Sequence, residues 1–383
     1  MSNLIAGQVH VKYENGSLRS FKVGDSEVLR RIYFAVRDEN WATYSPQIYD
    51  ETIIQNRDSF EINFRSDYER DKEVFLTWEV QIFGFDTGKI VFEIIGNVKQ
   101  DFQTNRAGFC VLHPIQGLTG HSVEIVHSNS STKTLAFPQL IDPYQPFFDV
   151  VGMNWGQNES RFSLQFEGDI FETEDQRNWG DASYKTYCTP LSVPFPRTLK
   201  KGETIHQKII FSVLEIAEKL ESIEKKDPPK TNFNIGIFAT KEQVKMDLTV
   251  MEKLKALNLG HYSAEIDLSE NEESDFESQI TLAENLNLPI DLKLIFSENI
   301  EEELGKVEIF LSSEILKIEY ITLLSKNELV TSPDLISKIN RIKEMAPDAK
   351  VGVGTNYNFT ELNRFRMNVK EADFVSFSFH PQV

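Results

Sequence analysis

The stretch "KLESIEKKDPPKTN", residues 219–232, divides the chain into two parts with different sequence patterns. A charged run followed by Pro228-Pro229 is typical of a short, stiff linker. At 383 residues the chain is also long enough for two domains. We therefore predict one domain over residues 1–218, a linker over 219–232 and a second domain over 233–383.

The part before the linker has the period of two that is typical of β-strands. In "SRFSLQFEGD", apolar Phe162, Leu164 and Phe166 alternate with polar residues. Residues 73–96 predict two strands joined by a turn at Asp86-Thr87-Gly88. Many short strands without amphipathic helices between them predict an antiparallel β-sandwich.

The part after the linker alternates strand and helix patterns, which predicts parallel βαβ units. It contains about five βα units and a sixth strand that ends at "FHPQV". A complete (β/α)₈ barrel needs about 250 residues, and fewer follow the linker. We predict an incomplete TIM-like barrel and expect a chain truncated at its C-terminal end; an open doubly wound sheet fits the same pattern.

Composition excludes several classes of partner. The chain has 40 basic and 59 acidic residues and a formal charge of −19, which argues against binding nucleic acid. No apolar run approaches the roughly 20 residues that span a bilayer, and the start has no signal-peptide pattern. We expect a cytoplasmic protein whose partner is a small molecule. GxSxG, HExxH, P-loop and GxGxxG motifs are absent, which disfavours a serine-hydrolase elbow and a dinucleotide site. We assign no metal ligand and no cofactor.

The stretch "FETEDQRNWGDASYKTY", residues 171–187, concentrates acids, cations and aromatic residues after a predicted strand. If the strand alternation continues, Asp175 and Arg177 lie side by side, which suits orienting a carboxylate or binding a carbonyl. The alternative is a salt-bridged structural corner in which Trp179 and Tyr184 fill the core.

A second candidate stretch is "NRAGFCVLHPIQGLTGHS", residues 105–122, which contains Arg106 and His113. Cys110 lies in an apolar run, so it is a weak candidate for a nucleophile. His113 and His121 are eight residues apart, a spacing that is not specific for a metal site, and a buried structural histidine is the alternative.

A third candidate region is the carboxyl ends of the predicted parallel strands, where such sheets bind ligands. We place there Glu265 and Asp267 on the second strand and Glu319 on the fourth. Amides and carboxylates at strand ends suit polyol hydroxyls, but pairing of Glu265 and Glu319 with neighbouring lysines is an alternative. After the fifth strand follow three further candidates, Asn356, Asn358 and Glu361.

Four stretches together resemble the D-apionate lactonase family of bacterial sugar-acid catabolism: "NRAGFCVLHP" (105–114), "EDQRNWGDASYKTY" (174–187), "GTNYNFTELNR" (354–364) and "FSFHPQV" (377–383). The resemblance implies an N-terminal β-domain, a TIM-like barrel and a small C-terminal β-domain that would lie beyond this chain. His380 departs from it, because the family favours Asn there. The implied activity is hydrolysis of a five-membered sugar-acid lactone to the open aldonate. If the active site needs the last barrel strands, a chain that lacks those strands would be inactive.

Lactone hydrolysis needs a base for water, stabilisation of the oxyanion and an acid for the leaving alkoxide. We assign Asp175 or Glu174 as base, Arg177 or Lys185 to the oxyanion and His113 as acid. The predicted substrate-binding residues are Trp179, Asp181, Arg106, Glu265, Glu319, Asn356, Asn358 and Glu361.

Two other functions fit the same residues. A glycoside hydrolase would use Glu319 as acid/base with a partner carboxylate elsewhere in the barrel. A non-catalytic carbohydrate-binding protein would stack Trp179, Tyr184 and Tyr187 on sugar rings.

Overall fold

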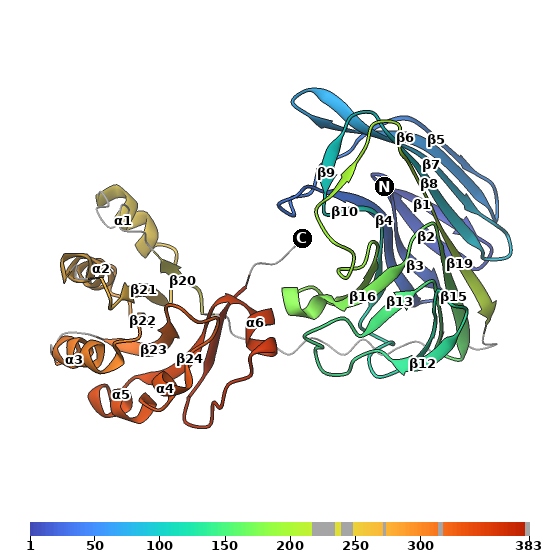
Figure 1. Cartoon of the computed structure of the whole chain (residues 1–383). Helices are drawn as coiled ribbons and strands as arrows, with labels where there is room; N and C mark the ends of the chain where they lie inside the picture. Colours follow the sequence, from blue (N-terminus) through green and yellow to red (C-terminus); the bar gives the residue numbers. More distant parts are fainter. Residues whose placement is uncertain (217–233, 239–247, 271–272, 313–316, 380–383) are drawn as a thin grey trace. The chain divides into compact units, whose positions relative to one another are not determined.

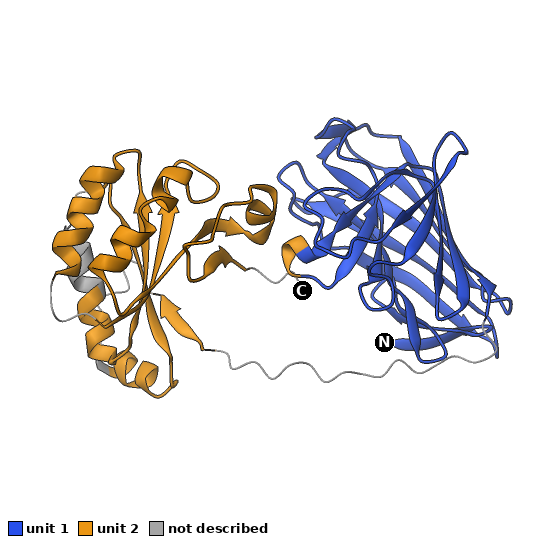
Figure 2. Cartoon of the chain, turned by 90° about the horizontal axis from the view of Figure 1, so that it is seen from below, with its two compact units in different colours: residues 1–177, 181–226 blue, residues 178–180, 227–383 orange. Residues whose placement is uncertain are grey.

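The computed structural model describes residues 1–216, 234–238, 248–270, 273–312 and 317–379. The chain forms two compact units (Figure 2): residues 1–177 with 181–226, and residues 178–180 with 227–383. We call them the β unit and the barrel unit. The predicted linker and His380 lie outside the described residues.

The described part of the β unit contains two large antiparallel sheets (Figure 1). The first has eight strands, in spatial order β1 (Ser2–Ala6), β2 (Val9–Glu14), β3 (Ser17–Val23), β4 (Ser26–Arg37), β10 (Arg106–Pro114), β17 (Ser183–Tyr187), β16 (Phe171–Asp175) and β13 (Phe147–Val150). The second has nine, in order β12 (Thr132–Ala136), β11 (Ser122–Val126), β14 (Gly152–Gln157), β15 (Ser160–Glu167), β19 (Thr204–Glu215), β8 (Ile90–Val98), β7 (Glu73–Gly84), β6 (Phe60–Arg70) and β5 (Gln47–Gln55). The unit also contains a short pair, β9 (Phe102–Thr104) with β18 (Arg197–Leu199). A 3₁₀ turn, Gln176–Trp179, follows β16, and its last two residues are assigned to the barrel unit.

Alternation along the strands builds the core of this unit. In β8, every second residue from Ile90 to Val98 is buried, while the residues between them are half-buried. The Phe92 ring contacts a ring of the first sheet, Phe109 on β10, at 5.1 Å between centroids. One apolar cluster therefore spans both sheets, and each such buried side chain contributes about 1.5–3 kcal/mol. The prediction of an antiparallel β-rich N-terminal part is confirmed.

The predicted turn at Asp86–Gly88 is also confirmed. It joins β7 to β8, and the Phe85 amide donates to the Lys89 carbonyl at 2.8 Å. Gly88 has φ +84°, a left-handed conformation that residues with a Cβ rarely adopt.

Within its described residues, the barrel unit contains one six-stranded parallel sheet in chain order: β20 (Gly236–Phe238), β21 (His261–Asp267), β22 (Ile290–Phe296), β23 (Ile318–Ser325), β24 (Lys350–Asn358) and β25 (Val375–Ser378). The described helices are α1 (Leu248–Lys255), α2 (Glu273–Leu286), α3 (Ile300–Leu311), α4 (Pro333–Ile336), α5 (Ile339–Met345) and α6 (Phe359–Arg364). Figure 1 shows α1 to α5 along one side of the sheet. The predicted alternation of parallel strands and helices is confirmed.

Local sequence explains how this unit is built. Ser332 caps α4 by accepting from the Leu335 amide at 3.3 Å, and Pro333 occupies the first helical position. Strands such as β22 bury every second residue between the sheet and the helices. Because all strands run the same way, their carboxyl ends form one edge of the sheet.

Candidate functional site

The stretch 171–187 is a pair of strands joined by a tight turn. β16 ends at Asp175, residues 176–179 form the 3₁₀ turn, and β17 returns antiparallel. The expectation that strand alternation runs on to Arg177 is wrong, because the turn begins directly after Asp175. Asp175 and Arg177 nevertheless lie together, since the turn folds the Arg177 side chain back over the strand end.

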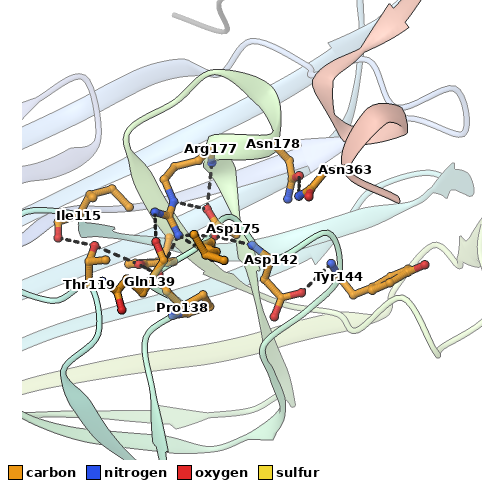
Figure 3. Close-up of polar contacts among 12 residues, drawn as sticks. Ile115, Thr119, Pro138, Gln139, Asp142, Tyr144, Asp175, Arg177, Asn178 and Asn363 are labelled. Atoms are coloured by element: carbon orange, nitrogen blue, oxygen red, sulfur yellow. Dashed lines mark hydrogen bonds and ion pairs between the residues drawn. The ribbon is translucent and has the colours of Figure 1, made fainter. Parts of the chain in front are cut away.

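The Arg177 guanidinium is bound on several sides (Figure 3). Its Nε and Nη2 donate to the two carboxylate oxygens of Asp175 at 2.9 and 2.7 Å. The same side chain donates to three successive carbonyls, Pro138, Gln139 and Leu140, at 2.8, 3.1 and 3.3 Å. The Asp175 side chain is fully buried and that of Arg177 is 16% exposed. The hydrogen bonds of Arg177 therefore connect the segment 138–140 to Asp175 at the end of β16.

Neighbouring groups strengthen this link. The Asp142 amide donates to Asp175 at 3.1 Å, and the Tyr184 hydroxyl donates to the Pro138 carbonyl at 2.6 Å. The guanidinium lies 5.2 Å from the Tyr184 ring. The hydrogen bonds that Arg177 donates to Asp175 raise the pKa of Arg177. These contacts fit the structural-corner alternative, and the catalytic roles of Asp175 and Arg177 remain predictions.

A second ion pair crosses the two strands. Lys185 lies opposite Glu174 in the strand register, with 3.0 Å between Nζ and Oε1, and the Tyr187 ring lies 5.1 Å from the ammonium. Burial alone would lower the pKa of Lys185, but the Glu174 carboxylate and other neighbours outweigh it and raise that pKa. Lys185 therefore stays cationic, as stabilisation of an oxyanion requires.

His113 lies on the opposite face of the same sheet from Lys185. It faces Tyr184 in the register with β17, so strand alternation points it away from Lys185. Its ring is fully buried, its Nε2 is hydrogen-bonded to Thr186 Oγ1 at 2.8 Å, and burial lowers its pKa to about 3. The histidine is thus neutral near pH 7, and the predicted acid is not brought together with the predicted Lys185–Glu174 pair.

Three further predicted binding residues come from the N-terminal part of the sequence. Trp179 ends the 3₁₀ turn and is half-buried, and Asp181 accepts from the Ser183 hydroxyl at 2.9 Å. Arg106 is 8% exposed at the start of β10.

A pocket opens at the carboxyl edge of the barrel-unit sheet. Its volume is about 140 Å³, and its polar lining comes from the ends of β21, β23 and β24 and from the loop after β23. The polar side chains that line it are Asp267, Ser325, Lys326, Glu328, Thr355, Asn356 and Tyr357.

An ion pair crosses the pocket. Lys326 Nζ lies 2.8 Å from Asp267 Oδ2 and donates to Ser269 Oγ at 2.7 Å. The hydrogen bond that Lys326 donates to Asp267 raises the pKa of Lys326. Burial would raise the pKa of Asp267, but hydrogen bonds from Lys326 and Ser269 outweigh it and lower that pKa. Both groups are therefore charged over the neutral range.

Family models match both units of the chain. Residues 1–215 match the N-terminal domain of D-apionate lactonase, and residues 235–383 match its TIM barrel domain. The chain belongs to the D-apionate lactonase family. A curated relative, D-apionate lactonase from Brucella anthropi, is 30% identical over the whole of this chain, which spans 66% of the relative's length.

Solved structures resemble the chain only distantly. Galactose 1-epimerase from Lactobacillus acidophilus NCFM has 6% identity and a TM-score of 0.34 over 55% of this chain and 92% of that one. The GalM/aldose epimerase homologue from C. elegans has 7% identity and a TM-score of 0.33 over 56% and 99%. Neither likeness is close enough to support an argument.

The predicted binding residues of the barrel unit differ in how close they lie to this pocket. Asn356 lines the pocket, Asn358 is the residue directly before α6, and Glu361 lies in the first turn of α6. Glu265 lies inside β21, two residues before the pocket-lining Asp267. The placement of Glu319 at a carboxyl end is wrong, because it is the second residue of β23 and lies roughly 20 Å along the strand from Ser325.

Sequence reasoning missed Lys326, Glu328 and Tyr357. The sequence signal that could have identified Lys326 is its position directly after the apolar strand "IEYITLLS".

Among the residues that the structure describes, no group of three or more His, Cys, Asp and Glu side chains could hold a metal ion. In the same part of the chain, no helix is both long and apolar enough to cross a membrane.

Proposed function

We propose that the chain takes part in the hydrolysis of a sugar-acid lactone such as D-apionolactone, and that the lactone binds at the carboxyl edge of the barrel sheet. The observation that carries the proposal is the Lys326–Asp267 ion pair in a pocket at that edge. The carboxyl edge is where TIM-barrel enzymes carry their active sites. The family relation supports the choice of a lactone, since the Brucella anthropi relative is a D-apionate lactonase.

In this proposal Lys326 stabilises the oxyanion that forms when water attacks the lactone carbonyl. Its raised pKa keeps the ammonium charged, and Asp267 orients it through the 2.8 Å contact. Because Asp267 also accepts from Ser269, the other lining carboxylate, Glu328, is our candidate for the base that activates water. Asn356 and Tyr357 would bind the hydroxyls of the sugar acid.

The residues first assigned from sequence remain a second proposed site. In the β unit, Glu174 as base and Lys185 as the cation for the oxyanion are the assignment that we keep, because their contact is with each other. Asp175 and Arg177 are bound to backbone groups as well as to each other. The glycoside hydrolase alternative is weakened by the distance of Glu319 from the pocket. A β-sandwich of the two large sheets is part of the proposal, supported by their shared apolar cluster.

A panel of lactones and aryl glycosides, followed by pH-stat and by release of the aryl group, tests the proposal. We expect acid release from a five-membered sugar-acid lactone, and a loss of about 10²–10³-fold in turnover for Lys326→Met. Lys338→Met is the matched control, because Lys338 is a half-exposed lysine of the same unit with its own ion pair to Glu301. Equal turnover in wild type and Lys326→Met would exclude the barrel pocket, and cleavage of the glycosides alone would favour the glycosidase function.

A further inference from the structure

Arg106 is a buried cation whose hydrogen-bonding capacity is only partly used. It is the first residue of β10 and is 8% exposed. Its Nη1 donates to the Asn105 carbonyl at 2.5 Å, but Nε and Nη2 are buried without an acceptor among the described residues. Burying a charge in this way is costly unless a partner compensates it. The arrangement therefore indicates that a partner is missing.

The two unpartnered nitrogens identify the kind of partner. Nε–H and the adjacent Nη2–H form a parallel fork that matches the two oxygens of a carboxylate. The same chain shows this fork filled, since Nε and Nη2 of Arg177 donate to the two oxygens of Asp175 at 2.9 and 2.7 Å. In Arg106 the corresponding pair of donors is empty.

Two aromatic rings lie over the Arg106 guanidinium. Its central carbon is 5.2 Å from the Trp41 ring and 5.1 Å from the Phe195 ring, and the two ring centroids are 5.1 Å apart. The rings come from the loops between β4 and β5 and between β17 and β18, and Trp41 and Phe195 are 41% and 43% exposed. They form a cap between the cation and solvent and contribute cation–π stabilisation.

The acids close to Arg106 are engaged with other donors. Burial lowers the pKa of Arg106, and the neighbouring Glu172 and Asp169 carboxyl groups act in the opposite direction. Glu172 accepts at its Oε1 from both the Tyr187 hydroxyl at 2.6 Å and the Leu191 amide at 2.8 Å. Asp169 accepts from Thr189 and Gln207. The fork of Arg106 is thus left for an anion from outside the chain.

We propose that Arg106, capped by Trp41 and Phe195, is a carboxylate-binding site of the β unit that takes an aldonate. Recognition of a carboxylate rests on the Arg106 fork alone, whereas the choice of an aldonate rests on the proposed function. Hydrolysis adds water across the lactone ester bond and gives a hydroxy acid, which loses a proton to become a carboxylate. The lactone itself has no carboxylate for the fork, so this site distinguishes the acid product from the lactone. The two rings must move aside for the anion to enter.

Binding of sodium D-gluconate, measured by calorimetry and by thermal shift, tests this inference. We expect gluconate, but not the uncharged D-glucitol at matched ionic strength, to bind and to raise the melting temperature. Arg106→Gln should weaken gluconate binding by roughly tenfold or more. Arg106→Lys should do the same because it keeps the charge but loses the fork. Arg19→Gln, which removes an exposed arginine from the same unit, should bind like wild type.

Ligand-free Arg106→Gln should melt at or above the wild-type temperature, because the uncompensated charge is gone. The inference is overturned if wild type does not bind gluconate, or if Arg106→Gln and Arg106→Lys bind it as tightly as wild type. Binding that disappears in Lys326→Met but survives in both Arg106 variants would place the anion in the barrel pocket and also overturn it. Absence of lactone hydrolysis, with gluconate binding that depends on Arg106, would contradict the proposed function alone.

Discussion

Replacing Arg177 by Met should destabilise the β unit strongly. The substitution leaves the fully buried Asp175 carboxylate without its counter-ion and removes the donors to the 138–140 carbonyls. Breaking a buried ion pair on one side costs about 3–5 kcal/mol. For a unit of this size each kcal/mol moves the melting temperature by about 2–4 °C, so the expected loss is about 6–20 °C.

Differential scanning calorimetry measures this loss, and two variants control it. Arg19→Met removes an exposed arginine of the same unit that pairs with Glu14, and its effect should stay within about 1 kcal/mol. The double variant Asp175→Asn/Arg177→Met should recover part of the loss, because the buried charge is gone. Melting of Arg177→Met within about 2 °C of wild type, together with a collapse of lactone turnover, would refute the structural role and favour the catalytic one.

Two further predictions concern ionisable groups. Lys326→Met should lose turnover about 10²–10³-fold in a pH-stat assay. Its melting temperature should fall by only a few degrees, because the Lys326 side chain is 38% exposed. A loss of stability as severe as the loss of activity would contradict this prediction. His113 has a folded pKa of about 3 against an ordinary 6.5, so its contribution to stability is present above pH 6.5 and is lost as the pH falls toward 3. The free energy of unfolding of wild type, measured with urea, should therefore fall by on the order of 4 kcal/mol over that pH range because of His113. A His113→Gln variant whose stability depends on pH in the same way as wild type would show that His113 does not titrate as predicted.

The fold was largely predictable because local patterns determine it. Period-two alternation and the Asp86–Gly88 turn were sufficient to identify β7 and β8, since each depends only on neighbouring residues. The Ser332-Pro333 pair likewise marks the start of α4 through a contact three residues away. Such local signals can be recognised in a single sequence.

The site was less predictable because its contacts are distant in the chain. The carbonyls that accept from Arg177 lie 37 to 39 residues before it, and no periodicity reports them. Glu319 was misplaced because the apolar run around it does not show which residue ends the strand; β23 continues to Ser325. His113 and Lys185 fall on opposite faces because of a register between β10 and β17 that only the folded sheet reveals.

The most direct test of the account is the rate of acid release from D-apionolactone by wild type, Lys326→Met and Lys338→Met, followed by pH-stat. The D-apionate lactonase of Brucella anthropi serves as the positive control. We expect hydrolysis by wild type and Lys338→Met and a loss of about 10²–10³-fold for Lys326→Met. Hydrolysis by the control enzyme but none by this chain, or equal rates for wild type and Lys326→Met, would contradict the proposed role of the barrel pocket.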